Sequence, residues 1–268
     1  MIALPTWLVL VWLAGAGAIL ASYANLAAVR IPRGQSSVTG ASACEACGHK
    51  VRPWDNVPVL SWLVLRGRCR DCGARFGVRH LVVELVGAAA FVVAGAVLLP
   101  TAGWAALAVV LVMVVGGLVL SLIDLQTHLL PDRVMLPWSI VLAVAMVAGT
   151  AVTGDWWALA RAGIGAVALF AFYFAAAMAY PAGMGFGDVK LAAPLGAVMA
   201  FVGWPALAVG AFCAFLLGAI GSAVLALRGR LRRKTEVPFG PWMVAGALVG
   251  VLAGPVIANW YLSVVGLA

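Results

Sequence analysis

Two aspartates stand out among the residues that could do chemistry. Asp124 ends an apolar run in Ile123-Asp124-Leu125, and Asp188 ends the glycine-rich turn Gly185-Phe186-Gly187-Asp188. The chain has only nine acidic residues, and ionisable side chains at membrane depth are costly to hold and usually functional. Two carboxylates that share a site cannot both ionise easily, so one keeps its proton while the other takes one from water. Such a pair can hydrolyse a peptide bond without a covalent intermediate.

The glycines before Asp188 suggest what the pair would act on. Gly185 and Gly187 offer no side-chain bulk, so an extended substrate backbone could approach closely. Taken alone, each acid has an equally good structural interpretation: Asp124 as an acid at a helix end, and Asp188 as the N-cap of the next helix. Taken together on one face, with glycines beside one of them, the acids favour a catalytic pair.

Four cysteines form a second candidate site. Cys44 and Cys47 make one Cys-x-x-Cys pair, and Cys69 and Cys72 make another, with 21 residues between the pairs. Each pair can supply two thiolates to one tetrahedral ion, and a glycine follows each pair where a tight turn needs a positive φ. The spacing predicts a closed, structural zinc site. Two disulfides are the alternative, which a reducing cytoplasmic location would disfavour.

The elements that must position these residues are membrane helices. The chain is 65% hydrophobic and 10% charged, whereas roughly a quarter of the residues in a soluble domain are charged. Most of its eight apolar stretches approach the roughly 20 residues that span a bilayer. They are 6–28, 81–99, 104–123, 134–152, 159–179, 191–203, 205–227 and 239–262. The stretch 191–203 is short and contains Pro194, so a half-helix or re-entrant segment is the alternative to a span there.

The fold class that follows is an all-α integral membrane protein. It has about eight transmembrane helices and a small zinc-ribbon-like insertion between the first two. We expect three parts: a first transmembrane helix (1–29), a cytoplasmic four-cysteine domain (30–80) and a membrane-embedded domain with both aspartates (81–268). The middle part is too small to bury much of a core and needs a staple such as a metal.

Positive charge predicts the orientation of these helices. Lys and Arg accumulate in cytoplasmic loops, and 16 of the 17 lie in segments that eight spans would place on one side. We therefore expect the 30–80 insertion and both aspartates on the cytoplasmic side. Anionic lipid headgroups account for the net charge of +8, so no nucleic-acid partner is expected.

A series of motifs runs along most of the chain in a fixed order. They are Ser22 to Pro32, Cys44 to Cys47, Asp55 to Trp62, Gly67 to Cys72, Arg79 with Glu84-Leu85, Ile123-Asp124 with Pro131-Asp132, Gly185 to Leu191, and Pro238 to Pro241. Together they resemble the type IV prepilin peptidases, which are membrane aspartyl proteases of the GxGD type.

The resemblance implies an activity and a location. Asp124 and Asp188 would be the catalytic aspartates, and the four cysteines would form a cytoplasmic zinc-binding domain. Members of the family cut the basic leader from prepilins and pseudopilins of type IV pili and type II secretion systems. The cut follows a glycine at the cytoplasmic face of the bacterial inner membrane. Many members then methylate the new N-terminal amine with S-adenosylmethionine.

Methylation has candidate residues near the insertion. Glu84, in the first turns of the second apolar stretch, could hold a cationic amine or the sulfonium. An acid favoured by the helix dipole is an equally good interpretation of Glu84. Gly67 and Arg68 are further candidates, and Arg68 stands where the family commonly has Lys. No glycine-rich fingerprint of a βαβ unit is present, so the insertion itself is the expected platform.

Two other classes of protein fit part of this pattern. A proton-coupled transporter would use the two aspartates as a relay, but relay acids normally lie near the membrane midplane. A non-enzymatic assembly scaffold would use the four-cysteine insertion as a docking module. A scaffold would keep its partner binding when each Asp is replaced by Asn.

Overall fold

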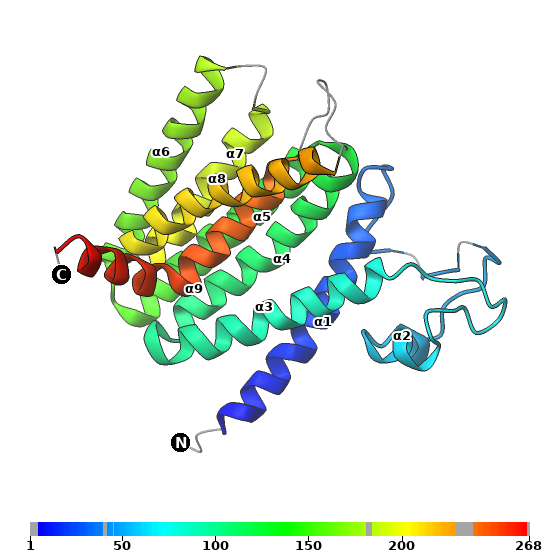
Figure 1. Cartoon of the computed structure of the whole chain (residues 1–268). Helices are drawn as coiled ribbons and strands as arrows, with labels where there is room; N and C mark the ends of the chain where they lie inside the picture. Colours follow the sequence, from blue (N-terminus) through cyan, green and yellow to red (C-terminus); the bar gives the residue numbers. More distant parts are fainter. Residues whose placement is uncertain (1–4, 40–41, 45, 181–183, 229–237, 267–268) are drawn as a thin grey trace. The chain divides into compact units, whose positions relative to one another are not determined.

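The computed structural model describes residues 5–39, 42–44, 46–180, 184–228 and 238–266, and these are mostly helical (Figure 1). Within these ranges the only β pairing is two isolated bridges, Ala43 with Lys50 and Arg68 with Arg75. The chain divides into two compact units, Met1–Ala96 and Val97–Ala268. The mostly helical fold class is thereby confirmed.

The first unit combines two long helices with the small insertion. It contains α1 (Thr6–Arg30), the 3₁₀ turn η1 (Pro53–Asn56), the short helix α2 (Leu60–Val64) and the first part of α3 (Arg79–Thr101). A Cβ at Gly17 would lie 2.5 Å from the carbonyl oxygen of Gly87. The backbones of α1 and α3 therefore touch at a point where both helices lack side chains, as is common between membrane helices.

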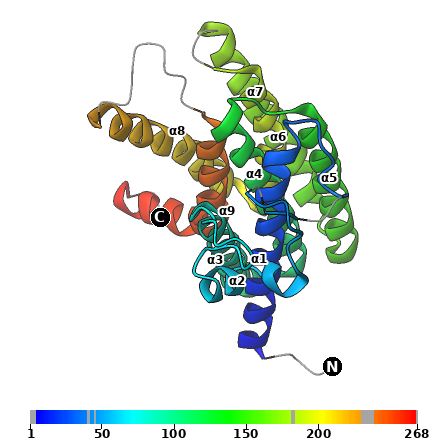
Figure 2. The same cartoon turned by 90° about the vertical axis from the view of Figure 1, so that its right-hand side faces the viewer.

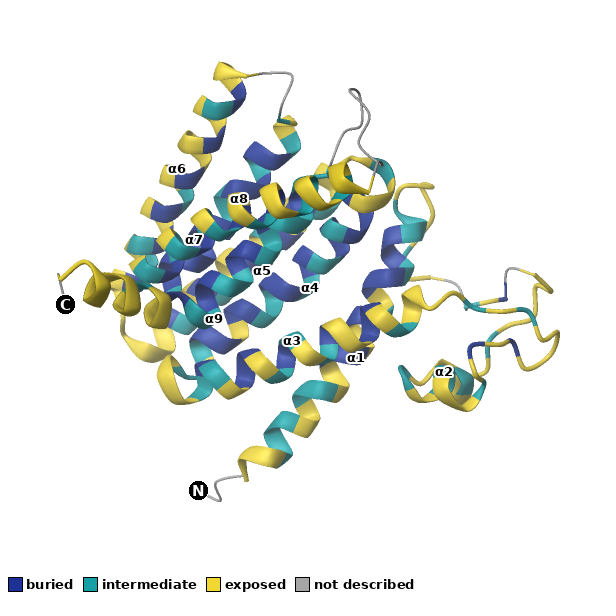
Figure 3. Ribbon diagram, in the orientation of Figure 1, coloured by how far each residue is buried: buried dark blue, intermediate teal, exposed yellow. Residues whose placement is uncertain are grey.

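The second unit is a bundle of membrane helices. They are α4 (Gly103–Thr127), α5 (Asp132–Thr153), α6 (Trp156–Ala179), α7 (Phe186–Val202), α8 (Trp204–Leu227) and α9 (Gly240–Val264). Helix α4 packs against α5, α7 and α9. It is the most buried candidate span, since 67% of its apolar window is buried against 17% for α8 (Figure 3). The outer helices expose many large apolar side chains, as a lipid-facing surface requires.

All eight apolar stretches form helices, and seven of these are long and apolar enough to cross a membrane: α1, α3, α4, α5, α6, α8 and α9. Helix α7 has 17 residues, which corresponds to about 25 Å. It begins at Phe186, earlier than its apolar stretch, because the polar turn that carries Asp188 is also helical. It packs alongside α6, as both views show (Figures 1 and 2).

Arg161 holds the far end of α7. Its guanidinium donates hydrogen bonds to the carbonyl oxygens of Ala200 (3.3 Å) and Phe201 (3.1 Å). In a continuous helix the Phe201 carbonyl would accept from the N–H of residue 205, but Pro205 has none. Arg161, near the start of α6, supplies that missing donor. The C-terminal end of α7 therefore lies beside the N-terminal end of α6.

Replacing Arg161 by Met should destabilise the second unit. An unsatisfied buried carbonyl costs about 1 to 3 kcal/mol, and two would lose their donor. The thermal unfolding midpoint in detergent should fall clearly below that of the wild type. Arg133→Met, at an exposed position, is the matched control and should unfold like the wild type. Equal midpoints for both variants would show that water replaces Arg161.

Candidate active site and metal centre

Asp124 lies in the last turn of α4 and is 4% exposed. One of its carboxylate oxygens, Oδ2, accepts a hydrogen bond of 3.0 Å from the backbone N–H of Gly240, the first residue of α9. Helix α4 ends just beyond, where His128 takes a left-handed conformation and its N–H donates to the Asp124 carbonyl. The carboxylate is thus buried at a helix end and held by the start of another helix.

Asp188 lies in the first turn of α7 and is 9% exposed. Gly185 is the N-cap of this helix, and its carbonyl accepts a hydrogen bond of 3.1 Å from the Asp188 N–H. The N-cap interpretation of Asp188 is therefore wrong, because the helix begins earlier than the apolar pattern indicates. An acid in the first turn is favoured by the helix dipole.

The fold brings the two aspartates into one site. A Cβ at Gly187, next to Asp188, would lie 3.0 Å from the Leu130 side chain. A Cβ at Gly240 would lie 3.5 Å from the same Leu130 side chain and 2.8 Å from Asp124 Oδ2. Leu130 thus packs against the glycine beside each acid, which places the two carboxyl groups on either side of one side chain. This arrangement can divide the roles of acid and base between two carboxyl groups.

The two glycines proposed for substrate approach differ in their surroundings. At Gly185 the atom nearest to an added Cβ is Asp188 Oδ2, at 3.6 Å. At Gly187 the space is already filled by Leu130. The absence of a side chain at Gly187 is therefore explained by packing within the chain, and Gly185 is the more open of the two.

An exposed ion pair ties the first turn of α7 to the start of α5. Lys190 Nζ lies 2.8 Å from an Asp132 carboxylate oxygen and 5.4 Å from the centre of the Phe186 ring. Exposed pairs contribute little to stability. The pair lies at the surface, apart from the two buried aspartates, and contributes little to holding them in place.

Gly240 belongs to this site, although the residue pattern predicts no role for it. It is part of the motif Pro238-Phe239-Gly240-Pro241, and a glycine between Phe and Pro at a helix start is the only local signal. Its role depends on contact with Asp124, which lies 116 positions earlier in the chain. Such a contact leaves no trace in spacing or periodicity.

Adding one methyl group at Gly240 should impair catalysis. A Cβ there would lie 2.8 Å from Asp124 Oδ2, closer than real Cβ contacts allow, so the carboxylate or the start of α9 must shift. We expect Gly240→Ala to slow peptide cleavage by roughly tenfold to a hundredfold, the cost of a small misplacement at a reacting group. Gly163→Ala, where a Cβ meets nothing within 4 Å, is the matched control. Wild-type cleavage rates in both variants would contradict this role of Gly240.

The four cysteines gather into one cluster in the first unit. Their sulfur atoms all lie within 4.8 Å of one another, and none of the four forms a disulfide. The sulfurs of Cys44 and Cys72 are 3.8 Å apart, which matches the edge of about 3.8 Å of a tetrahedron with Zn–S bonds of about 2.3 Å. The cysteines therefore fit a four-thiolate metal site with no open coordination position.

The backbone turns tightly after each pair of cysteines. Gly48 (φ +72°) and Gly73 (φ +71°) follow the two pairs in left-handed conformations, and each donates its N–H to the carbonyl of the first cysteine of its pair. Backbone N–H groups of Cys47 and Ala46 lower the pKa of the Cys44 thiol to about 7, whereas burial and the neighbouring cysteine sulfurs raise the pKa of the Cys72 thiol, so Cys44 is the first of the two to ionise. This favours the thiolate, the form that binds metal.

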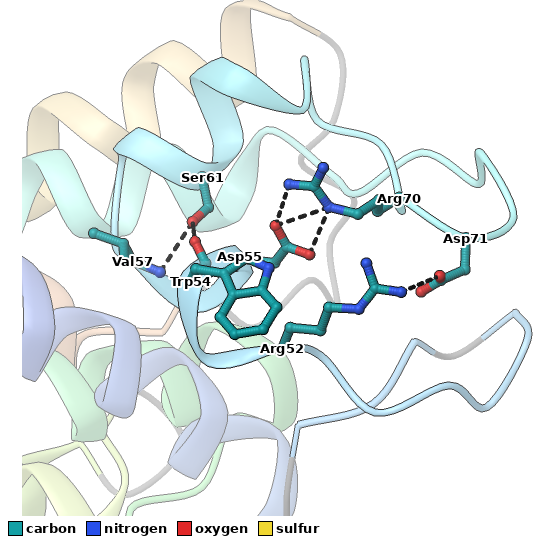
Figure 4. Close-up of polar contacts among 7 residues, drawn as sticks. All are labelled: Arg52, Trp54, Asp55, Val57, Ser61, Arg70 and Asp71. Atoms are coloured by element: carbon teal, nitrogen blue, oxygen red, sulfur yellow. Dashed lines mark hydrogen bonds and ion pairs between the residues drawn. The ribbon is translucent and has the colours of Figure 1, made fainter.

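Two ion pairs connect the cysteine loops to the rest of the insertion (Figure 4). Arg70 donates three hydrogen bonds to the Asp55 carboxylate, with Nη2 to Oδ1 at 2.6 Å, Nε to Oδ2 at 2.9 Å and Nε to Oδ1 at 3.1 Å. These bonds lower the pKa of Asp55 below its ordinary value. Arg52 and Asp71 form the second pair at 3.0 Å.

The first unit also contains a cavity of about 520 Å³, lined by residues of α1, the insertion and α3. Glu84 and Gly67 lie on its wall. Glu84 is 7% exposed and accepts a hydrogen bond of 2.7 Å from the Val59 N–H. Arg68 is exposed and does not line the cavity. Of the three candidates for methylation, two therefore face a common space.

Fold and sites together define a helical membrane protein with a paired-aspartate site and a four-cysteine cluster. Residues 16–98 match the family model for the bacterial peptidase A24 N-terminal domain, and residues 111–223 match that for the type IV leader peptidase family. The first segment corresponds closely to the first unit of the structure, and the second lies within the second unit.

Three relatives, each named prepilin leader peptidase/N-methyltransferase, are similar to most of this chain. The Aeromonas salmonicida (strain A449) protein is 38% identical over 84% of this chain and 75% of its own length. The Burkholderia pseudomallei (strain 1026b) protein is 39% identical over 80% and 67%, and the Bacillus subtilis (strain 168) protein is 31% identical over 92% and 95%. No solved structure matches significantly. The chain belongs to the type IV leader peptidase family.

Proposed function

We propose that this protein is an aspartyl endopeptidase of the bacterial inner membrane. It removes the basic leader from type IV prepilins or pseudopilins and then methylates the new N-terminus. The observation that carries the proposal is the placing of Asp124 and Asp188 in one buried site, with Leu130 against the glycine beside each acid. The names of the relatives support the same reaction pair.

Asp124 is the base of this pair and Asp188 the acid. The Gly240 N–H donates to Asp124, and a donor of this kind stabilises the charged form of a carboxylate. Asp124 takes a proton from water while the water oxygen bonds to the scissile carbonyl carbon. Asp188 gives its proton to the carbonyl oxygen in the same step. The C–N bond then breaks as Asp124 passes its proton to the leaving amine, and Asp188 recovers a proton from the tetrahedral intermediate.

The substrate would meet this site at the membrane boundary. Asp124 lies in the last turn of α4 and Asp188 in the first turn of α7, so neither acid is in the middle of a helix, where a proton relay would place it. The apolar helix of a prepilin would lie in the bilayer with its leader in the cytoplasm. The glycine before the cut would pass beside Gly185, where the substrate backbone meets no side chain.

Two bound groups complete the proposal. A zinc ion would be held by Cys44, Cys47, Cys69 and Cys72 and would fold the insertion without taking part in catalysis. S-adenosylmethionine would be held in the cavity of the first unit, which lies within the usual 300 to 1,000 Å³ of small-molecule sites. When bound, it supplies the methyl group. Glu84 would hold a cationic group there, because its buried carboxylate forms no ion pair with any described residue.

Mass spectrometry of a prepilin co-expressed with this protein tests both activities. Loss of the leader reports cleavage, and the added mass of one methyl group on the new N-terminus reports methylation. A prepilin that keeps its leader, with the membrane protein folded and present, would refute the peptidase. A cleaved but unmethylated N-terminus would refute the second activity alone.

A further inference from the structure

Three polar groups on the wall of the cavity have bonding capacity that no described residue uses. The Asn25 Oδ1 atom and the Trp62 Nε1 atom are buried and have no hydrogen-bond partner. The carboxylate of Glu84 uses only one oxygen, toward the Val59 N–H. All three residues line the same cavity, and Asn25 and Glu84 are 3% and 7% exposed.

Such groups are costly unless something in the cavity satisfies them. A buried donor or acceptor without a partner is destabilising, and a buried charge without a counter-ion is more so. Within the part of the chain that the structure describes, only four side-chain atoms are buried and unpartnered, and two of them belong to residues that line this cavity. An acceptor, a donor and the Glu84 carboxylate share one space of about 520 Å³ with Arg30, Arg33 and Arg75. This lining points to a polar ligand that carries both a positive and a negative charge.

We infer that Asn25 and Trp62 recognise the methyl donor. This inference rests on the proposed function, since it assumes that the cavity takes S-adenosylmethionine or its product S-adenosylhomocysteine. These molecules carry a cationic amine, further N–H donors and ring or carboxylate acceptors. The amine pairs with Glu84, an N–H group donates to Asn25 Oδ1, and the Trp62 N–H donates to an acceptor.

The position of the Trp62 ring explains why Gly67 is a glycine. Gly67 has φ +66°, and a Cβ there would lie 2.9 Å from Trp62 Cε2 and 3.0 Å from its Nε1. Any other residue at position 67 would push the indole N–H from its place. Gly67 is therefore a positioning residue that acts through Trp62.

The entry to α2 is held in a strained conformation by Glu84. Val59 has φ +63°, which is rare for a β-branched residue. Leu60 donates its N–H to the Pro58 carbonyl across this tight turn, and the Val59 N–H is taken by Glu84. Strain of this kind persists only where the surroundings fix it, and it concentrates at functional sites. The hydrogen bond from Val59 to Glu84 therefore joins α2 to α3, so that Trp62 and Glu84 line the same cavity as Asn25 of α1.

Binding of S-adenosylhomocysteine, which cannot transfer a methyl group, tests the inference. Calorimetry on the full-length protein in detergent should show that Trp62→Phe, which keeps a ring and removes the N–H, binds about fivefold to thirtyfold more weakly than the wild type. Asn25→Leu should show a similar loss. Trp54→Phe is the matched control, because Trp54 is 66% exposed and does not line the cavity.

Prepilin cleavage by the same variants separates the possible failures. We expect Trp62→Phe and Asn25→Leu to cleave like the wild type, because the aspartates lie in the other unit. Wild-type protein that cleaves but binds no S-adenosylhomocysteine would remove the proposed cofactor role and the inference with it. Wild-type binding with unchanged affinity in both variants would overturn the inference alone.

Photocrosslinking keeps the test independent of how the variants fold. Radiolabelled S-adenosylmethionine should label wild-type peptides that contain the cavity wall, around Asn25 or Trp62. Excess S-adenosylhomocysteine should prevent the labelling. Specific labelling confined to residues 97–268 would overturn the inference.

Discussion

Replacing either buried aspartate by asparagine should abolish leader cleavage while the protein stays folded. Asparagine has nearly the same shape but can neither give up nor accept the proton that the reaction moves. Loss of a general acid or base costs about 10²-fold to 10⁴-fold, and in the proposed mechanism each aspartate moves a proton in both steps of the reaction. We therefore expect Asp124→Asn and Asp188→Asn each to cleave at least about a thousandfold more slowly, measured by single-turnover assay with purified prepilin.

Asp132 supplies the matched control for this experiment. It is an exposed acid at the start of α5, paired with Lys190 beside the first turn of α7. Asp132→Asn changes the same charge near the same helix and should keep cleavage within a few-fold of the wild type. Residual activity within a few-fold in either buried variant would remove the aspartyl mechanism. Comparable losses in all three variants would show a general effect of charge at this end of the bundle.

The helices of this fold could be predicted because their cause is local. Runs of apolar residues long enough for a bilayer predict the seven helices that could span it, and the short run 191–203 predicts that α7 is shorter than these. The start of α7 was misjudged, because Gly185 to Asp188 is polar and glycine-rich yet the helix already begins at Phe186. A glycine N-cap and an acid in the first turn overcame the unfavourable propensity of Gly187.

The acids and the cysteines could also be chosen from the sequence, since each is a chemical type that is costly or rare in its setting. The contacts that complete the sites could not. Gly240 reaches Asp124 from the start of α9, and Leu130 fills the space beside Gly187. In the sequence, Asn25 is only a polar residue within an apolar helix. Its unpartnered oxygen and its place in the cavity lining are known only from the structure. Each of these depends on close approach between segments distant in sequence.

Removing the metal should unfold the insertion. Of the described residues between 31 and 78, only Cys44, Gly67 and Cys69 are buried. Two of these three are candidate metal ligands, so the insertion has almost no apolar core of its own. Where a hydrophobic core is missing, metal binding supplies the folding energy, about 10 to 16 kcal/mol for structural zinc in small domains. We expect about one zinc per chain in the purified protein and none in Cys69→Ser.

Metal analysis and limited proteolysis together test this prediction. Loss of zinc should open residues 31–78 to protease while the helices of the second unit stay protected, because those helices bury their own apolar faces. Cys213→Ser is the matched control: Cys213 lies alone in α8, so its replacement should keep the metal and the resistance of the insertion. A wild-type protein with four reduced thiols, no metal and a protease-resistant insertion would contradict the zinc assignment. The folding of the segment would then have to come from the Arg70–Asp55 and Arg52–Asp71 pairs, whose arginines are about half exposed and which are too weak for that role.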